Sequence, residues 1–301
     1  MGLRTHREAV ESFEREIPHL TAINRMEVGR KNLGPISGEQ LARYDRDGVI
    51  FPIPVLTPAE LTVFKAGFDE VEARVLDKFH YTGFTHLHFR WAFDLATHPV
   101  VADAVEGVLG PDVLVYGTLI ICKDPRTMGY VAWHQDGEGF GNAPSVSAWI
   151  GLTDSTPENG CMRVLAGSHK LNRLPHFRTY TSGNNLLRDD VKIRHDVRDE
   201  EATDVILKAG EMSLHDKNVI HGSNPNISAR RRIGFIIRFV TPQLKESRHP
   251  VVRVRGDGDC SHLSTIGEPP AGSLDDSIAS WRRRTDNHAR AGPPLPCPRE
   301  S

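Results

Sequence analysis

Cysteine is scarce in this chain: four occur among 301 residues, and no two of them form a CxxC pair. This spacing disfavours both a zinc knuckle and a framework of disulfide bonds. The N-terminal stretch MGLRTHREAVESFEREIPHL has no apolar core, so it lacks the pattern of a secretory signal. Both absences favour a reducing compartment, and we expect a cytoplasmic protein.

Long apolar runs and net charge are also lacking. No apolar stretch approaches the roughly 18 residues that cross a bilayer, and the formal net charge is −2. Such a chain offers little general electrostatic attraction for nucleic acids or anionic membranes. We therefore expect a small-molecule substrate as its partner, with no nucleic acid and no membrane. The composition leaves the oligomeric state open.

The first third of the chain carries helix-capping signals. Residues 37–40 (SGEQ) form a capping box, and Gly48 suits the end of a short helix. Residues 57–60 (TPAE) predict a second helix start, with proline at its first position and an apolar stripe after it. A third amphipathic helix is expected over residues 97–110.

From residue 112 the period changes to that of short strands. The β-rich runs are separated by clusters of Gly, Pro, Asn and Ser. Strands that follow a helical block indicate an α+β, mainly β protein with an antiparallel sandwich or barrel and flanking N-terminal helices. The runs cover residues 112–123, 145–154, 204–216 and 231–240.

The stretch WHQDGEGFG places His134 and Asp136 two residues apart, before a glycine-rich turn. On a strand, residues i and i+2 face the same side, so one imidazole and one carboxylate could reach a single metal ion. A lone HxD pair is weak evidence in a chain with 15 histidines. The glycines after it suggest a pliable rim through which a substrate approaches the metal.

His221 strengthens the metal hypothesis. It precedes a turn-forming run, residues 222–228, and another apolar strand follows. If the two strands form a hairpin centred between Asn226 and Ile227, Arg232 lies opposite His221. Two histidines and one carboxylate form the facial triad of non-haem Fe(II) oxygenases. A guanidinium nearby binds a carboxylate through two hydrogen bonds. An α-keto acid cosubstrate would then place its keto-acid end on iron and its distal carboxylate on Arg232.

In order and spacing, these motifs resemble the phytanoyl-CoA dioxygenase family of Fe(II)- and 2-oxoglutarate-dependent oxygenases, over about residues 40–242. The resemblance implies a double-stranded β-helix (jelly-roll) core with helices packed outside. We expect an N-terminal extension over 1–36, the oxygenase domain over 37–243 and a partly loosely ordered C-terminal extension over 244–301. The matching stretches are GPDVLVYGTLIICK, WHQD, AWIGLTDSTPENGCMRVLAGSHK, AGEMSLHD and HGSNPNISARRR.

The resemblance also implies roles for single residues. His134, Asp136 and His221 match the iron ligands, and Arg232 matches the residue that pairs with the C5 carboxylate of 2-oxoglutarate. Halogenases related to this family have a small residue in place of the carboxylate, so the presence of Asp136 makes halogenation unlikely for this chain. Three further residues match positions beside the cosubstrate: Trp149, Leu119 and His86.

For several other basic residues near these motifs, a role outside the metal and cosubstrate sites is also considered. His215 lies six residues before His221, and we expect it behind the ligands more than on the metal. Arg230 and Arg231 are interpreted as a solvated strand edge. Residues 86–90 (HLHFR) suit either a contact with the cosubstrate or the protein surface.

The combined pattern predicts an Fe(II)-dependent dioxygenase that uses 2-oxoglutarate and O2 as cosubstrates. We expect hydroxylation of an unactivated C–H bond in a small or medium-sized polar metabolite, such as an intermediate of secondary metabolism. Desaturation, epoxidation and cyclisation remain alternatives, as do a zinc or manganese hydrolase and a non-catalytic ligand-binding jelly roll. By location alone, the substrate is expected to contact Glu138, Phe140 and Asn142.

Overall fold

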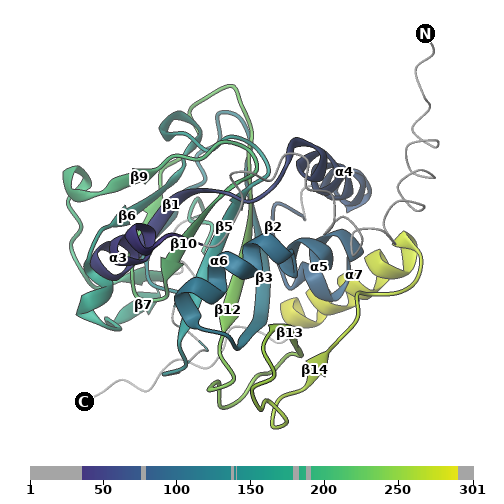
Figure 1. The fold of residues 1–301 in the computed structure, drawn as a ribbon. Coiled ribbons are helices and arrows are strands. Elements are labelled where there is room, and N and C mark those ends of the chain that lie inside the picture. The colour runs from purple at the N-terminus through teal and green to yellow at the C-terminus, as the bar shows by residue number, and fades with distance from the viewer. Residues whose placement is uncertain are drawn as a thin grey trace.

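Two β-sheets face each other at the centre of the molecule, with helices on the outer face of the larger sheet (Figure 1). The computed structural model describes residues 36–75, 79–136, 139, 141–178, 183–187 and 191–290. The major sheet contains β1 (Val49–Pro54), β2 (Tyr81–Gly83), β3 (Val113–Lys123), β5 (Ser145–Gly151), β10 (Glu211–Asp216), β12 (Arg232–Val240), β13 (Val251–Arg255) and β14 (Thr265–Ile266). The minor sheet contains β4 (Val131–His134), β6 (Met162–Leu165), β9 (Thr203–Val205) and β11 (Ile220–Ser223).

The strand order confirms the predicted double-stranded β-helix. The major sheet follows β1-β10-β5-β12-β3-β13-β14, with β2 also paired to β3, and the minor sheet follows β4-β11-β6-β9. All pairs are antiparallel except β13 with β14. The predicted strand over 204–216 divides into β9 and β10, because Gly210 adopts a left-handed conformation with φ 86° between them. A two-stranded ribbon, β7 (His176–Arg178) with β8 (Val191–Ile193), lies in the long polar excursion.

The helices begin where the capping signals predicted. Ser37 Oγ accepts a hydrogen bond from the backbone of Gln40 at the start of α3, which ends at Gly48 with φ 74°. Two helices were missed: α5 begins at Arg90, the last residue of the HLHFR stretch, and buries Trp91, which is 5% exposed, and α7 lies in the predicted C-terminal extension. The helices are α3 (Gly38–Asp47), α4 (Pro58–Val75), α5 (Arg90–Ala96), α6 (Pro99–Leu109) and α7 (Leu274–Arg290), with short 3-10 turns η3 (Thr85–Leu87), η4 (Pro157–Asn159), η5 (Ser168–Leu171) and η7 (Asp199–Glu201).

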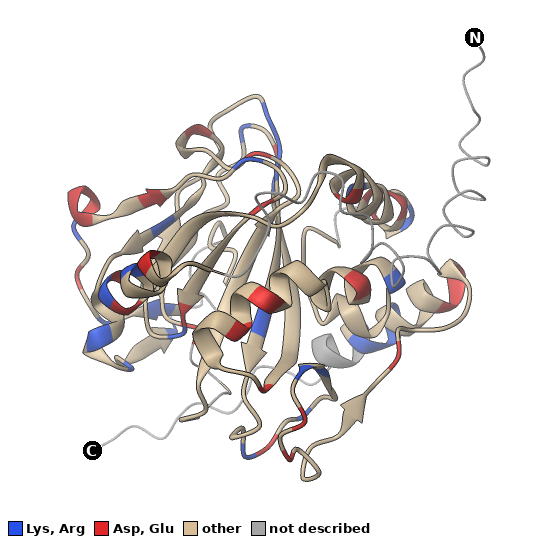
Figure 2. Ribbon diagram, viewed as in Figure 1, with Lys and Arg blue, Asp and Glu red and all other residues tan. Residues whose placement is uncertain are grey.

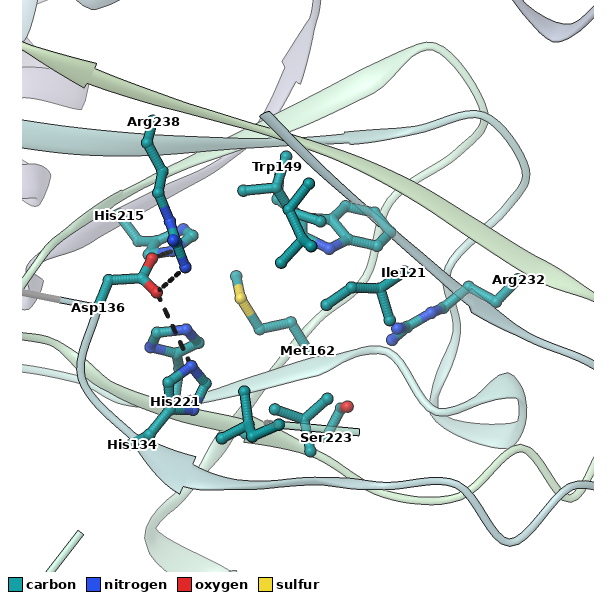
Figure 3. Close-up of a pocket in the computed structure, with 15 residues that line it drawn as sticks. Ile121, His134, Asp136, Trp149, Met162, His215, His221, Ser223, Arg232 and Arg238 are labelled. Carbon is teal, nitrogen blue, oxygen red and sulfur yellow. Dashed lines mark hydrogen bonds and ion pairs between the residues drawn. The ribbon is translucent and has the colours of Figure 1, made fainter. Parts of the chain in front are cut away.

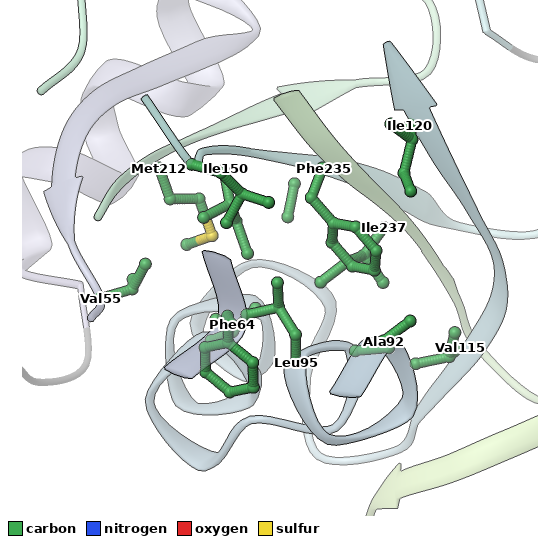
Figure 4. Close-up of a cluster of buried hydrophobic side chains, with 14 of the residues drawn as sticks. Val55, Phe64, Ala92, Leu95, Val115, Ile120, Ile150, Met212, Phe235 and Ile237 are labelled. Atoms are coloured by element: carbon green, nitrogen blue, oxygen red, sulfur yellow. The ribbon is translucent and has the colours of Figure 1, made fainter. Parts of the chain in front are cut away.

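Strands β3, β5 and β12 of the major sheet contribute to two cores, because successive side chains point to opposite faces. Phe235 of β12 joins the cluster under the helices, together with Phe64 of α4 and Leu95 of α5 (Figure 4). The next residue, Ile236, joins the cluster between the two sheets with Trp149. The helices therefore close one face of the sheet and leave the other to form a pocket.

The core continues past residue 243, where we had placed the end of the oxygenase domain. Strand β13 pairs with β3 through Val252 and Val115. In α7, Trp281 is 1% exposed and donates a hydrogen bond from Nε1 to Thr82 Oγ1. We therefore propose that residues 36–290 form one folded unit.

The predicted hairpin between His221 and Arg232 is wrong. Strand β11 pairs with β4 and β6 in the minor sheet, so His221 lies opposite His134 and Val164. Strand β12 pairs with β3 and β5 in the major sheet, and Arg232 lies opposite Lys123. The turn signals were correct, but the turn carries the chain from one sheet to the other.

Charged residues are spread over the outer helices and loops. In the view of Figure 2, both acidic and basic positions are scattered over these elements. Among the helices of the described ranges, none has both the length and the apolar character needed to cross a bilayer.

Candidate active site

Two histidines and one carboxylate meet between the two sheets. His134 ends β4 and pairs in register with His221 of β11, which brings their ring centroids to 4.0 Å. Asp136 follows β4 by two residues, and its Oδ1 lies 3.8 Å from His134 Nε2. The three residues can each offer one ligand atom, all within 4.8 Å of one another, and all three are buried.

Backbone carbonyls orient both imidazole rings. His134 Nδ1 lies 2.9 Å from the oxygen of Ala132, and His221 Nδ1 lies 3.0 Å from that of Val219. If each Nδ1 carries the proton, each Nε2 keeps its lone pair for a metal. Burial lowers the pKa of His134 to about 4 and holds the pKa of His221 well below its usual range. Both rings are therefore neutral at pH 7, as metal ligation requires.

Asp136 is held by donors from three strands of the major sheet. Ser147 Oγ donates to Oδ2 at 2.7 Å, and Arg238 Nη2 donates to Oδ1 at 2.9 Å. His215 Nε2 lies 3.5 Å from Oδ2. Burial raises the pKa of Asp136, but the charge of Arg238 and the contact with His215 outweigh it, so the pKa lies well below the usual value. The carboxylate is ionised and fixed in orientation.

This donor set suits an iron ion. Two neutral imidazoles and one carboxylate on one side of an ion leave the remaining positions open for other ligands. Hydrogen bonds to the far side of each ligand are typical of metal sites, because they orient the ligand and tune its basicity.

Arg232 lies at the other end of the same pocket (Figure 3). Its side chain is 1% exposed, its guanidinium carbon lies 5.3 Å from the centre of the Trp149 ring, and Nη1 donates to the carbonyl oxygen of Gly160. Nε has no hydrogen-bond partner, and among the described residues no carboxylate pairs with it. Burial lowers its pKa to about 10, so at pH 7 the group is a buried cation without a counter-charge.

Trp149 forms a wall between the two ends of the pocket. A side chain at Gly234 would place a Cβ 2.2 Å from the indole, so glycine on β12 is what lets Trp149 lie flat against the sheet. Ser223 and Leu119 also line the pocket. The pocket is lined by Leu119, Ile121, Val131, His134, Asp136, Trp149, Met162, Leu187, His215, His221, Gly222, Ser223, Arg232, Ile236 and Arg238.

The model of the phytanoyl-CoA dioxygenase (PhyH) family matches residues 44–234, which include the cluster and Arg232. The chain belongs to the PhyH family. Its enzyme class follows from the family: it is a non-haem Fe(II)- and 2-oxoglutarate-dependent oxygenase.

Relatives of this PhyH chain match between 44% and 84% of its length. Ectoine dioxygenase of Nocardia farcinica (strain IFM 10152) is 27% identical over 243 residues, which are 68% of this chain and 78% of that protein. The peroxisomal phytanoyl-CoA dioxygenase of Homo sapiens is 29% identical over 145 residues, 44% of this chain and 41% of that protein. Among solved structures, the apo form of the non-haem monooxygenase ThoJ is 28% identical with a TM-score of 0.67, covering 84% of this chain and 100% of that one.

The structure brings together most residues that the PhyH resemblance had singled out, but not His86. Its Nδ1 lies 3.0 Å from Thr118 Oγ1, on the face of β3 opposite to Leu119, and it does not line the pocket. The prediction that His86 lies beside the cosubstrate is therefore not supported.

The three predicted substrate contacts fare differently. Asn142 lines a separate surface hollow with Ala143 and Gln243, away from the cluster. Glu138 and Phe140 lie outside the described residues.

Sequence reasoning missed Ser147, Ser223 and Arg238. Each had a signal in strand alternation, because each lies an even number of residues from a residue that we had placed in the pocket. Ser147 is two before Trp149, Ser223 is two after His221, and Arg238 is six after Arg232. His215, expected behind the ligands, lines the pocket within 4.8 Å of the His221 ring centre.

Proposed function

We propose that this PhyH-family enzyme hydroxylates an unactivated C–H bond of a small or medium-sized metabolite. In the overall reaction, substrate, 2-oxoglutarate and O2 yield hydroxylated product, succinate and CO2. One observation supports the proposal most: Arg232 is a buried guanidinium for which the described residues supply no counter-charge, in the same pocket as the His-Asp-His cluster. Such a cation requires an anionic partner, and the distal carboxylate of 2-oxoglutarate supplies one.

The proposed roles follow from position. His134, Asp136 and His221 would hold Fe(II), which, when bound with 2-oxoglutarate, supplies the oxidising chemistry that no amino-acid side chain provides. Arg232 would bind the C5 carboxylate with the two-pronged geometry of a guanidinium. Trp149 would flank the cosubstrate, since its ring already lies against the Arg232 side chain.

Ser223 fits the same subsite as a hydrogen-bond donor. Lys123 Nζ lies 2.7 Å from Ser223 Oγ and also donates to the carbonyl oxygen of Asn224. When Lys123 is protonated it only donates, so Ser223 Oγ accepts from it and the hydroxyl hydrogen of Ser223 can point into the pocket. Burial, and then the charge of Arg232, lower the pKa of Lys123 to about 6; an anion bound between the two would favour the protonated form.

A zinc hydrolase would explain less of this site. Hydrolysis needs only the metal and its water, so it would leave the buried Arg232 without a role. The similar structure ThoJ is named a non-haem monooxygenase, and this name favours insertion of oxygen over desaturation or cyclisation.

The test is a metabolite screen with purified protein, Fe(II), 2-oxoglutarate and O2. We expect some fractions to stimulate succinate release and to yield a product heavier by one oxygen atom. A product lighter by two hydrogen atoms would instead mean desaturation or ring closure.

His221→Ala is the matched variant in that screen. It should bind Fe(II) or Ni(II) weakly and release no succinate, because only two protein ligands remain. Normal turnover by His221→Ala, or turnover supported by zinc in place of iron, would refute the proposal.

A further inference from the structure

A second guanidinium in the pocket is left unused by the proposed chemistry. Arg238 lies on β12 six residues after Arg232, on the same face of the strand. Six residues of strand span roughly 20 Å. One dicarboxylate bound to Arg232 and to the metal site would therefore not extend beyond the metal to occupy Arg238 as well.

The two arginines differ in exposure. Arg232 is 1% exposed and marks the closed end of the pocket. The Arg238 side chain is 31% exposed and lies beside the His-Asp-His cluster, at the opposite end in Figure 3. Arg238 lies opposite Gly117 of β3, the residue that follows Tyr116. A Cβ at Gly139, in the loop after the cluster, would lie 3.0 Å from the Tyr116 hydroxyl. Arg238 is therefore at the open end.

The Arg238 guanidinium has hydrogen-bonding capacity to spare. It carries five N–H donors, and among the described residues its one hydrogen bond goes from Nη2 to Asp136 Oδ1. Nε is buried without a partner.

Charge balance points the same way. With iron bound, Asp136 becomes a ligand, and its negative charge is shared with the metal. The iron, Asp136, doubly charged 2-oxoglutarate and Arg232 together are neutral. Any charge on Lys123 is at the closed end beside Arg232, so Arg238 leaves one positive charge at the other end of the loaded pocket. Charges enclosed in a pocket favour a partner of opposite sign.

We propose that Arg238 binds an oxyanion of the substrate, so that the enzyme acts on anionic metabolites, with a carboxylate as the group that its planar fork matches. This inference rests on the proposed function, because it assigns the closed end to the cosubstrate. His215, which is 1% exposed, lines the same end, and its Nδ1, which has no hydrogen-bond partner among the described residues, offers a second polar contact.

The experiment uses protein saturated with Ni(II) and 2-oxoglutarate, a combination that does not turn over. Benzoate and benzamide, a carboxylate and its neutral isostere, are titrated separately and followed by calorimetry. The binding of 2-oxoglutarate to the nickel-loaded protein is measured first. If 2-oxoglutarate does not bind, the proposed function fails; a result on benzoate alone concerns only Arg238.

We expect wild-type protein to prefer benzoate to benzamide by about tenfold, the effect of one charge-assisted hydrogen-bonded pair. Arg238→Gln should lose this preference while its affinity for 2-oxoglutarate stays unchanged. Arg238→Lys, which keeps the charge without the fork, should recover part of it. Arg230→Gln, an exposed arginine in the loop before β12, is the matched control and should behave as wild type.

Three results would overturn the inference. The first is wild-type protein that binds neither probe or binds both equally. The second is Arg238→Gln that retains the preference for benzoate. The third is Arg238→Gln that still binds Ni(II) but loses 2-oxoglutarate, which would assign Arg238 to the cosubstrate.

Discussion

At the scale of one residue, Arg232 destabilises the folded protein in order to bind a ligand. A buried cation without a counter-ion costs free energy in the folded protein. The cost is offset when a dicarboxylate arrives. Asp136 presents the opposite case, since Ser147, Arg238 and His215 already hold its charge before any metal binds.

Arg232→Leu tests this interpretation. The variant should bind 2-oxoglutarate more weakly by roughly 2–5 kcal/mol, while its affinity for Ni(II) stays the same. Without 2-oxoglutarate its melting temperature should equal or exceed that of wild type, because a buried unpaired charge has been removed. Calorimetric titration and thermal unfolding measure both effects. Unchanged 2-oxoglutarate affinity would mean that another group anchors the carboxylate.

At the scale of elements, Glu60 joins two helices. It caps the start of α4, where its Oε2 accepts hydrogen bonds from the backbone and hydroxyl of Thr57, both at 2.8 Å. Its Oε1 lies 3.4 Å from Nε2 of His98, the residue before α6. Burial raises the pKa of Glu60, but the hydrogen bonds from His98 and Thr57 outweigh burial and lower it from 4.5 to about 2.

The folded-state pKa lies below the unfolded one, so ionised Glu60 stabilises the fold above about pH 4.5, and the contribution fades as the pH falls toward 2. Glu60→Gln should lower the free energy of unfolding by roughly 3 kcal/mol at pH 7. The difference from wild type should shrink below pH 4.5. Urea unfolding between pH 7 and 3.5 measures it, with the exposed Glu39→Gln as control. A difference independent of pH would contradict the assignment.

At the scale of the whole molecule, segments far apart in sequence complete one core. The rings of Trp281 in α7 and Phe79 lie 5.8 Å apart, and β13 covers the edge of β3. The pocket is on the other face of the same sheet, so the C-terminal segment supports the site without touching it.

A chain that ends at residue 243 should therefore fail to fold cooperatively. The full-length variant Trp281→Ala should lose about 3–5 kcal/mol of stability, and Trp281→Phe should lose less, because most of the ring is retained. Circular dichroism during thermal unfolding measures the melting transition of the truncated chain and of both Trp281 variants. A truncated chain that melts cooperatively near the wild-type temperature would show that the oxygenase domain does end near residue 243.

Local patterns in the sequence determined a large part of this protein. The capping residues determined where α3 and α4 begin, and β-rich runs between turn residues determined β3, β5 and β12. The spacing of His134 and Asp136 determined that one strand end could present two ligands. These features depend on neighbours in the chain, so a single sequence carries them.

The pairing of strands was decided by the tertiary structure alone. Backbone hydrogen bonds between strands are the same for every residue type, so the turn after His221 could not reveal that β11 and β12 enter different sheets. Arg232 and His221 therefore share the pocket because their two sheets face each other, and not because they are paired in a hairpin. The same packing turned His86 to the far face of β3 and placed Arg238 at the open end of the pocket, because which groups share a cavity depends on how whole sheets stack.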